Sequence, residues 1–266
     1  HYPLRRQRQM CIRDRINTNP NGLDTLRQHM VKASAPGKCI LFGEHAVVYG
    51  QPALACSIDQ RMIIEIESEK TFNAWRVDGR TMDAKKHPHI EYIRTRLPPH
   101  DGQPMHIRIR GTIPKASGLG SSAALSVALC GALQQIRDEA IDPVQASVLS
   151  HLAEAEAQGG RASPMDTATS SLGGFVVLSD AIEEGLDYIE TRTMDVNGET
   201  RQWHLHTFNA QIPEGVALVV GNTGVRGSTS AMVDQVARLI ETNPKRKVEL
   251  ETIGAIARWG IQSLQE

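Results

Sequence analysis

The stretch Ile113-Pro-Lys-Ala-Ser-Gly-Leu-Gly-Ser-Ser-Ala-Ala124 joins a predicted strand to a predicted helix. Gly118 and Gly120 let the backbone approach a ligand closely, and Ser121 and Ser122 supply hydroxyl groups that favour the start of a helix. Several backbone N–H groups and the positive end of a helix dipole then point at one place, which suits a phosphate. An ordinary glycine-containing turn before a capped helix is the alternative, and spacing alone does not choose between them.

The common nucleotide-binding motifs are absent from this sequence. Lys38 follows Gly37, but position 32, where the P-loop pattern needs a glycine, is Lys32. The dinucleotide-binding glycine fingerprint is missing as well. A nucleotide bound by the 113–124 loop would therefore be held by a loop of another kind.

The flanking sequence alternates strand and helix signals. Strands are predicted at Met62–Glu67, Met105–Arg110, Phe175–Leu178 and Val216–Val220, and helices at Ser121–Ile136, Pro143–Gln158, Ser230–Ile240 and Leu250–Leu264. Asp142 is the expected N-cap of the second helix, which should stop at Gly159-Gly160. The polar stretch 180–211, with a turn signal at Asn197-Gly198, indicates a hairpin or an excursion between two domains. This mixture predicts an α+β fold.

Composition excludes several classes of protein. The chain has 266 residues, enough for one large or two modest domains, and a net charge of −1 gives no basic field for nucleic acid. No apolar run is long enough for a membrane span. The four cysteines form no C-x-x-C pair and no dense pattern, which argues against a zinc site or a disulfide scaffold and favours reduced thiols in a cytoplasmic enzyme.

The first fifteen residues differ from the rest. His1–Arg15 holds five Arg and one Asp, and it lacks the apolar region of a signal peptide. We expect a non-native or disordered arm at 1–15, with a basic targeting arm as the alternative.

Two further segments carry candidate chemistry. In Ala35–Gly50, Lys38, Glu44 and His45 interrupt an apolar, glycine-containing run, although each alone is more typical of a strand end or the surface. In the third segment, Ser163–Gly174, Asp166 follows Ser-Pro and by default would be only a helix cap.

Together, the three segments resemble in order and content the family of galactose, homoserine, mevalonate and phosphomevalonate kinases. Gly43-Glu-His-Ala-Val47 looks like the mevalonate kinase version, and Gly118–Ala124 is shared across the family. The stretch from Gln158 to Gly174 resembles the shorter archaeal and bacterial mevalonate kinases, as does Gly221–Gly224 with the Ser-Thr that follows. The likeness runs from about Val31 to the end.

The resemblance implies a two-domain small-molecule kinase fold. Residues 30–183 would form an N-terminal α/β sandwich domain with an unusual left-handed crossover, against the general right-handed rule. Residues 184–211 would connect it to an incomplete ferredoxin-like domain at 212–266. The family's third glycine-rich motif is not found before Glu266, so the resemblance implies a truncated second domain.

The activity implied by the resemblance is transfer of the γ-phosphoryl group of ATP to the 5-hydroxyl of mevalonate, with Mg²⁺ as cofactor. Asp166 would accept the hydroxyl proton or orient the hydroxyl, and Lys38 would lower the pKa of Asp166 and polarise the substrate. Substrate would also contact Glu44, His45 and Thr167. The residues implied to bind ATP are Pro114, Lys115, Ala116, Ser117, Gly118, Leu119, Gly120, Ser121, Ser122 and Ala123.

Ser122 and Glu154 would hold the Mg²⁺. The run Gly159-Gly160-Arg161 is one residue longer than in the related enzymes, which leaves Glu156 as an alternative ligand. Residues i and i+2 of a helix do not share a face, so only one of the two glutamates can point to the site, and the motif register favours Glu154.

Two rival functions stay open. One is another kinase of the family, acting on phosphomevalonate, homoserine or a sugar; Glu44-His-Ala-Val argues against the last two. The other is a non-catalytic nucleotide-binding relative, for which the pair of Lys38 and Asp166 would be unnecessary. The expected partners are mevalonate and ATP, with no nucleic acid and no membrane, and the sequence leaves room for a homodimer.

Overall fold

The computed structural model describes residues 30–68, 73–114, 117–160, 162–196, 198–210, 215–221, 224 and 229–265. The predicted arm at 1–15 lies outside the described residues, as do Lys115 and Ala116 of the candidate phosphate loop.

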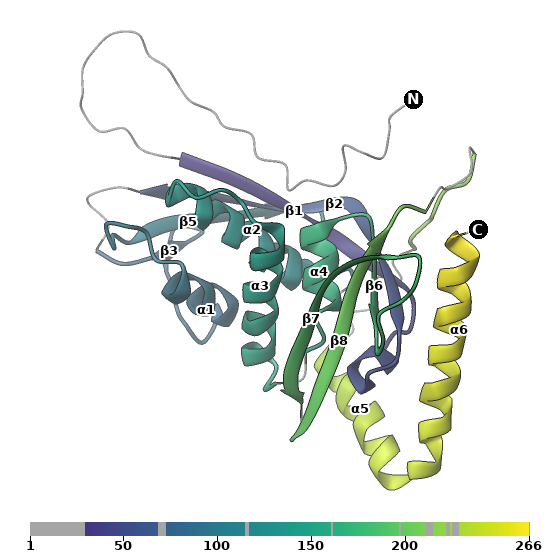
Figure 1. Ribbon diagram of the computed structural model, residues 1–266. Helices are drawn as coiled ribbons and strands as arrows, with labels where there is room; N and C mark the ends of the chain where they lie inside the picture. Colours follow the sequence, from purple (N-terminus) through teal and green to yellow (C-terminus); the bar gives the residue numbers. More distant parts are fainter. Residues whose placement is uncertain are drawn as a thin grey trace.

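One long strand, β2 (Ala53–Ser68), organises the sheet (Figure 1). β1 (Met30–Phe42) runs antiparallel along one of its edges. Two strands share the other edge: β5 (Met105–Gly111) pairs with residues 62–68, and β6 (Phe175–Ser179) pairs with residues 53–56. Ser57 and Arg61 still bond to Gly174 and Thr112 beside these two strands, so residues 58–60 of β2 lie opposite a gap between the strand ends.

The remaining strands extend the sheet at both ends. Beyond β5 lie the short strands β3 (Arg76–Val77) and β4 (Arg80–Thr81). Beyond β6 lies a hairpin of β8 (Glu199–Phe208) and β7 (Asp187–Val196), with β8 hydrogen-bonded to β6. The hairpin predicted within 180–211 is thus confirmed, and it continues the sheet.

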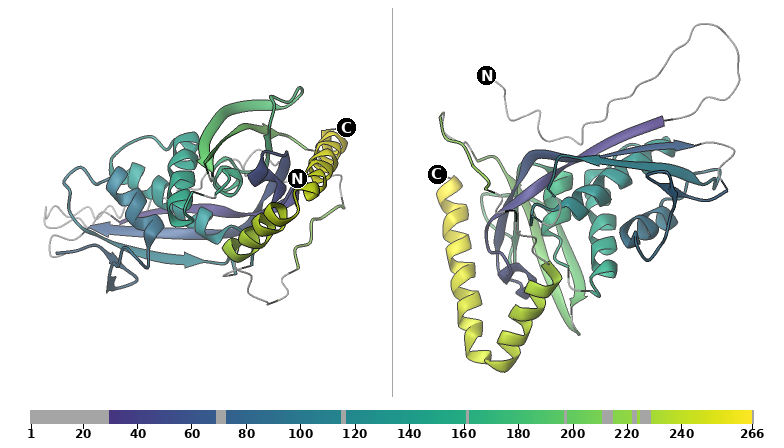
Figure 2. Two further views of the ribbon diagram at one scale, coloured as in Figure 1. Left: turned by 90° about the horizontal axis from the view of Figure 1, so that it is seen from below. Right: turned by 180° about the vertical axis from the view of Figure 1, so that it is seen from behind.

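Four helices cover one face of the sheet, as Figure 2 shows from two further directions: α1 (Pro88–Arg96), α2 (Ser121–Ile136), α3 (Pro143–Ala157) and α4 (Met165–Leu172). Buried residues of α2, such as Leu129 and Leu133, pack against Ile64 and Ile107 of the sheet. Near β6, Met165 of α4 and Trp203 of β8 form a second apolar cluster. Burial of these side chains attaches the helices to the sheet.

The C-terminal segment comprises α5 (Thr229–Thr242), the 3₁₀ turn η3 (Pro244–Arg246) and α6 (Lys247–Gln265). Ile261 of α6 joins a third cluster with Leu54 and Val177. Because successive strand residues point to opposite faces, Leu54 faces away from the cluster that holds Ala53 and Ala55, so α6 packs on the other side of the sheet.

The predicted helices are confirmed with small shifts at their ends. Asp142 caps α3 as expected, accepting hydrogen bonds from the N–H groups of Val144 and Gln145 at 2.9 and 3.2 Å. Gly159 and Gly160 follow the helix with positive φ. The α+β fold class is confirmed.

The strand predicted at Val216–Val220 is wrong. Residues 215–221 form no regular element, and Val219 is 87% exposed. An apolar run becomes a buried strand only when neighbouring strands take up its backbone hydrogen bonds, and among the described residues no strand lies beside this one. The described residues after 212 therefore show helices but no ferredoxin-like sheet, and the left-handed crossover stays a prediction.

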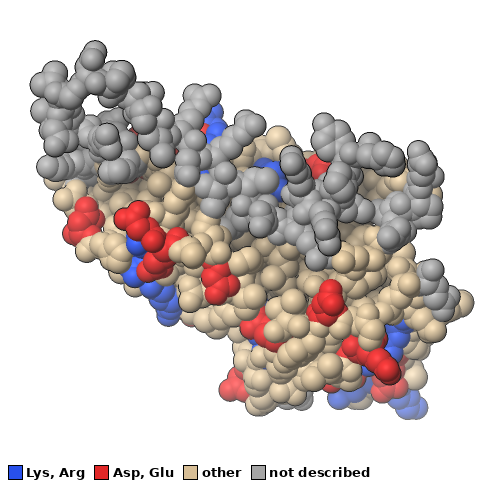
Figure 3. Space-filling model, turned by 45° about the horizontal axis from the view of Figure 1, so that its top comes forward, with Lys and Arg blue, Asp and Glu red and all other residues tan. Residues whose placement is uncertain are grey.

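None of the described helices is both long enough and apolar enough to cross a membrane. On the part of the surface that is not grey in Figure 3, acidic and basic side chains lie scattered among other residues, without a continuous patch of one sign.

Candidate functional site

The site forms around the irregular part of β1 between Pro36 and Lys38, which pairs with residues 57–61 of β2. The β1–β2 register shifts between Pro36 and Lys38, and the N–H of Lys38 donates to the carbonyl of Leu119 at 3.1 Å. A Cβ on Gly37 would lie 2.7 Å from that same carbonyl oxygen, so only glycine permits this approach. The irregular strand thus brings the glycine-rich loop onto Lys38.

An ion pair joins the segments Ala35–Gly50 and Ser163–Gly174. The Lys38 Nζ lies 3.0 Å from Oδ1 of Asp166, and these two side chains are 5% and 39% exposed. Asp166 lies in the first turn of α4, whose N-cap is Pro164, so it is not the cap of that helix. Its remaining carboxylate surface is free to meet a substrate.

Burial and charge act against each other in this pair. Burial alone would lower the pKa of Lys38, but the negative charges of Asp166 and Glu44 outweigh it and raise that pKa. Burial raises the pKa of Asp166, and Lys38 opposes this only in part. The charge of Lys38 thus lowers the pKa of Asp166 as predicted, but desolvation of the carboxylate outweighs this effect and leaves that pKa above its ordinary value.

The glycine-rich loop ends at the start of α2 in a form that the sequence did not predict. The N-cap is Gly120, with φ at +70°, rather than one of the serines. Glycine has no side chain to accept hydrogen bonds from the first turn, so those N–H groups stay available to an anion. A Cβ on Gly120 would lie 2.8 Å from Cγ of Lys38. The helix start and the lysine are thus in direct contact.

Glu154 is the glutamate that faces the site. It is buried, whereas Glu156 on the same helix is exposed. Its Oε2 accepts a hydrogen bond from Gln158 at 2.7 Å and lies 3.4 Å from Nε2 of His89. Burial favours the protonated acid, but hydrogen bonds involving His89, Ser122 and Gln158 outweigh it and lower the pKa of Glu154.

A cation fits this carboxylate. Among the described residues, Oε1 of Glu154 is buried without a hydrogen-bond partner, and the hydroxyl of Ser122 lies near enough to act on the same carboxyl. The described residues contain no cluster of three His, Cys, Asp or Glu side chains. Mg²⁺ usually takes one or two protein oxygens and completes its shell with water and phosphate, so a single carboxylate with a hydroxyl is sufficient.

The segment that follows β1 carries Glu44 and His45, two of the residues predicted to contact the substrate. Glu44 is exposed, close enough to Lys38 and Asp166 to act on both of their pKa values. His45 has φ at +62°, an uncommon backbone conformation for a residue other than glycine, and it caps η2 (Ala46–Tyr49). Thr167 is buried and its hydroxyl donates to the carbonyl of Pro164, so its role as a substrate contact stays a prediction.

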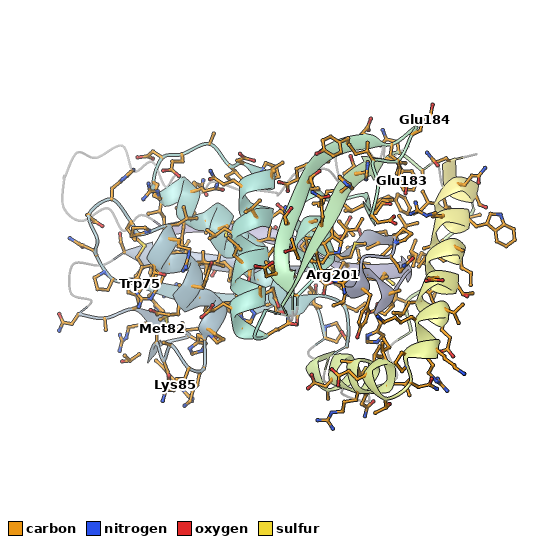
Figure 4. All side chains as sticks on the ribbon, turned by 60° about the horizontal axis from the view of Figure 1, so that its bottom comes forward. Trp75, Met82, Lys85, Glu183, Glu184 and Arg201 are labelled. Carbon is orange, nitrogen blue, oxygen red and sulfur yellow. The ribbon has the colours of Figure 1, made fainter. Side chains whose placement is uncertain are left out.

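The β7–β8 hairpin holds the segment that follows β1 in place. The sequence did not predict this contact. Nε1 of Trp203 donates to the carbonyl of Val47 at 2.9 Å. Arg201, labelled in Figure 4, donates from Nη1 to the carbonyl of Tyr49 at 3.4 Å. Both donors come from β8 and both acceptors from η2, so the hairpin fixes the turn that follows Glu44 and His45.

The hairpin also holds α3. The buried guanidinium of Arg192 donates to Oγ of Ser147 at 2.9 Å and pairs with Glu190. One turn along α3, Nε2 of His151 lies 2.9 Å from the carbonyl of Ala162, which precedes α4. These bonds connect the helix that carries Glu154 to the helix that carries Asp166.

His151 is expected to make folding sensitive to acid. Burial lowers its pKa to about 4, against 6.5 in an unfolded chain. As the pH falls below 6.5, the unfolded chain takes up a proton at this histidine and the folded chain does not. The free energy of unfolding therefore decreases between pH 6.5 and about pH 4, where the folded chain is protonated as well. The loss amounts to about 3 kcal/mol. Urea unfolding of the wild type and His151→Gln, which keeps an N–H donor but does not titrate, should show a smaller acid loss in the variant. Equal losses would contradict the assignment.

Comparison with known proteins identifies the family. A sequence profile of the GHMP kinases N terminal domain matches residues 86–174, a range that includes the glycine-rich loop, Glu154 and Asp166. The mevalonate kinase of Methanothermobacter thermautotrophicus is 39% identical over 177 residues, which cover 63% of this chain and 58% of that protein. The mevalonate kinase of Pyrococcus furiosus is 31% identical over 251 residues, which cover 85% of this chain and 67% of that protein.

The fold agrees with this likeness. The crystal structure of L. major mevalonate kinase in complex with R-mevalonate matches with a TM-score of 0.57 and 21% identity, over 91% of this chain and 70% of that one. The chain thus spans only about three fifths to two thirds of the length of the two curated relatives. It belongs to the GHMP kinase family, in which these relatives are mevalonate kinases.

Proposed function

We propose that this chain carries the ATP- and substrate-binding part of a mevalonate kinase, which transfers the γ-phosphoryl group of ATP to the 5-hydroxyl of mevalonate. The observation that carries the proposal is the ion pair of Lys38 and Asp166, 3.0 Å apart beside the glycine-rich loop. The names of the curated relatives, and the mevalonate bound by the L. major enzyme, support this substrate.

The residues of the site divide the work of phosphoryl transfer, which consists mainly of positioning and charge stabilisation. Asp166 would accept the proton of the attacking hydroxyl, and a raised pKa makes its carboxylate a stronger proton acceptor. Lys38, held protonated by its neighbours, would stabilise charge between that hydroxyl and the phosphate. Glu44 and His45 would hold the polar groups of mevalonate.

The loop from Pro114 to Ala123 would receive the phosphates of ATP. Ser122 and Glu154 would hold Mg²⁺, because Oε1 of Glu154 is buried with no hydrogen-bond partner among the described residues. When bound, this ion neutralises charge on the phosphates. The protein's own contribution is the backbone of the loop, with the open first turn of α2 behind it.

A substrate comparison tests the proposal. ATP consumption is followed with mevalonate, phosphomevalonate, homoserine and galactose, using this chain and a version extended to the length of its relatives. We expect phosphorylation of mevalonate alone. Turnover of another alcohol in place of mevalonate would show that the proposed substrate is wrong. ATP binding without turnover in both versions would favour a non-catalytic relative.

Replacing Glu154 by glutamine is expected to raise the Mg²⁺ concentration required for activity by at least roughly tenfold, because a neutral amide is a poor ligand for this ion. Glu156→Gln is the matched control, since this exposed residue lies two positions away on the same helix. The Mg²⁺ dependence of phosphorylation measures both. If only Glu156→Gln needs more Mg²⁺, the assignment of the metal ligand is reversed.

A further inference from the structure

Two free cysteines lie directly opposite each other in the strand pair that carries Lys38. Cys39 of β1 is the register partner of Cys56 of β2. Residues paired in this way point to the same face of a sheet, with Cα atoms roughly 4.5–5.5 Å apart, which is within the span of roughly 4.4–6.8 Å found in disulfides. Because successive strand residues alternate, both thiols lie on the face opposite to the Lys38 side chain.

The local backbone leaves room for the small closure that a disulfide requires. The β1–β2 register shifts on both sides of Cys39, between Pro36 and Lys38 and again between Ile40 and Phe42. Cβ atoms of opposed residues are about 4.5–5.5 Å apart, against about 3.5–4.5 Å in a disulfide. A short paired stretch between two irregularities can shift more easily than the middle of a continuous ladder.

We propose that Cys39 and Cys56 form a reversible intramolecular disulfide when the protein meets a low-molecular-weight disulfide such as oxidised glutathione. This modification does not depend on the kinase activity. Cys39 and Cys56 directly follow Lys38 and directly precede Ser57, and Lys38 and Ser57 are themselves register partners. The new bond would therefore fix the pairing of β1 and β2 next to the catalytic lysine.

The chemistry takes two exchange steps. The Cys39 thiolate attacks one sulfur of oxidised glutathione, so that a Cys39–glutathione disulfide forms and one glutathione leaves as a thiol. The Cys56 thiolate then attacks Cys39 sulfur, which forms the Cys39–Cys56 bond and releases a second glutathione. Two protein thiols are oxidised, and one disulfide is reduced to two thiols.

The order of attack follows from the surroundings of the two groups. Burial and the neighbouring Cys39 raise the pKa of Cys56 to about 11, so Cys56 is rarely a thiolate and reacts slowly with a reagent in solution. Cys39 is half-buried and more accessible. The second step is intramolecular, and proximity compensates for the low fraction of thiolate.

One peptide reports the reaction. Trypsin cleaves after Lys38 and Arg61, and no Lys or Arg lies between, so both cysteines fall in the peptide Cys39–Arg61. The Cys11→Ser variant is treated with oxidised glutathione, unreacted thiols are alkylated, and the digest is analysed by mass spectrometry. We expect this peptide to lose two hydrogen atoms and to take up no alkylating agent, and we expect a reductant to reverse the change.

Matched variants make the result decisive. Cys56→Ser should stop at the first step and keep a glutathione adduct on Cys39. Cys130, fully buried in α2, should stay reduced throughout. The proposal fails if the peptide keeps two alkylatable thiols or a stable Cys39 adduct while Cys56 stays free. It also fails if Cys130 is oxidised at the same rate, since the reacting species would then be unfolded chain.

Discussion

Replacing Asp166 by asparagine is expected to lower kcat for mevalonate phosphorylation by ~10²–10⁴-fold, the usual contribution of one general base. Asparagine has the same shape and keeps a carbonyl oxygen that can accept a hydrogen bond from Lys38, so the main loss is the capacity to take a proton. Binding of Mg²⁺-ATP should persist, because Asp166 is proposed to act on the alcohol substrate and not on the nucleotide. Lower kcat with retained nucleotide affinity is typical of an interaction made in the transition state.

The partner lysine provides the control for this prediction. Lys38→Met should lower kcat by a similar factor, and the double variant should be little worse than either single one, since residues in contact do not act additively. Steady-state kinetics and nucleotide titration of all three variants measure this. Near-normal kcat in folded Asp166→Asn would remove the catalytic role of Asp166 without removing the kinase proposal.

Local chemistry predicted most helix ends correctly. The cap at Asp142 and the stop at Gly159-Gly160 depend on residues within one turn of the helix end, so the sequence contains all that is needed. The start of α2 was predicted less well. The serines suggested a hydroxyl cap, but contact between Gly120 and Lys38 decides the conformation there, and that contact spans 82 positions in the chain.

Long-range contacts account for what the sequence could not show. Arg192 and Ser147 are 45 positions apart, and Trp203 and Val47 are 156 apart. Nothing in either local pattern points to its partner, so the sequence left a hairpin and an excursion between domains as alternatives for 180–211 and did not predict these contacts. In the structure, the β7–β8 hairpin contacts η2 and α3 and holds both in place. At Val216–Val220 the local pattern predicts a strand, but the segment is exposed and forms none, because its surroundings do not provide a neighbouring strand among the described residues.

The candidate site came from the order of three motifs rather than from any one of them. Lys38 alone resembled a strand-end lysine, and Asp166 alone resembled a helix cap. The family resemblance implied that they meet, and the 3.0 Å ion pair agrees with it. The effect of Lys38 on the pKa of Asp166 was predictable from the motifs, but the opposing desolvation of the carboxyl was not, because it depends on how the folded chain surrounds that group.

Gly120→Val is expected to abolish binding of Mg²⁺-ATP. Two effects combine at this position. The φ of +70° is costly for any residue with a Cβ and more so for a β-branched one, and the new Cβ would lie 2.8 Å from Cγ of Lys38. To relieve the clash, either the loop must move away from the start of α2 or Lys38 must move away from Asp166. Either movement removes backbone N–H groups or a cation from the place where the phosphates are proposed to bind.

Gly118→Val separates these two effects. Gly118 also has a positive φ, +76°, but a Cβ there would meet no atom within 4 Å. Both variants therefore suffer backbone strain, and only Gly120→Val disturbs the lysine. Calorimetric titration with Mg²⁺-ATP, after thermal unfolding has shown that each variant is folded, should find much weaker binding in Gly120→Val than in Gly118→Val. Equal losses would assign the effect to strain in the loop, and unchanged affinity in a folded Gly120→Val protein would exclude this loop from the nucleotide site.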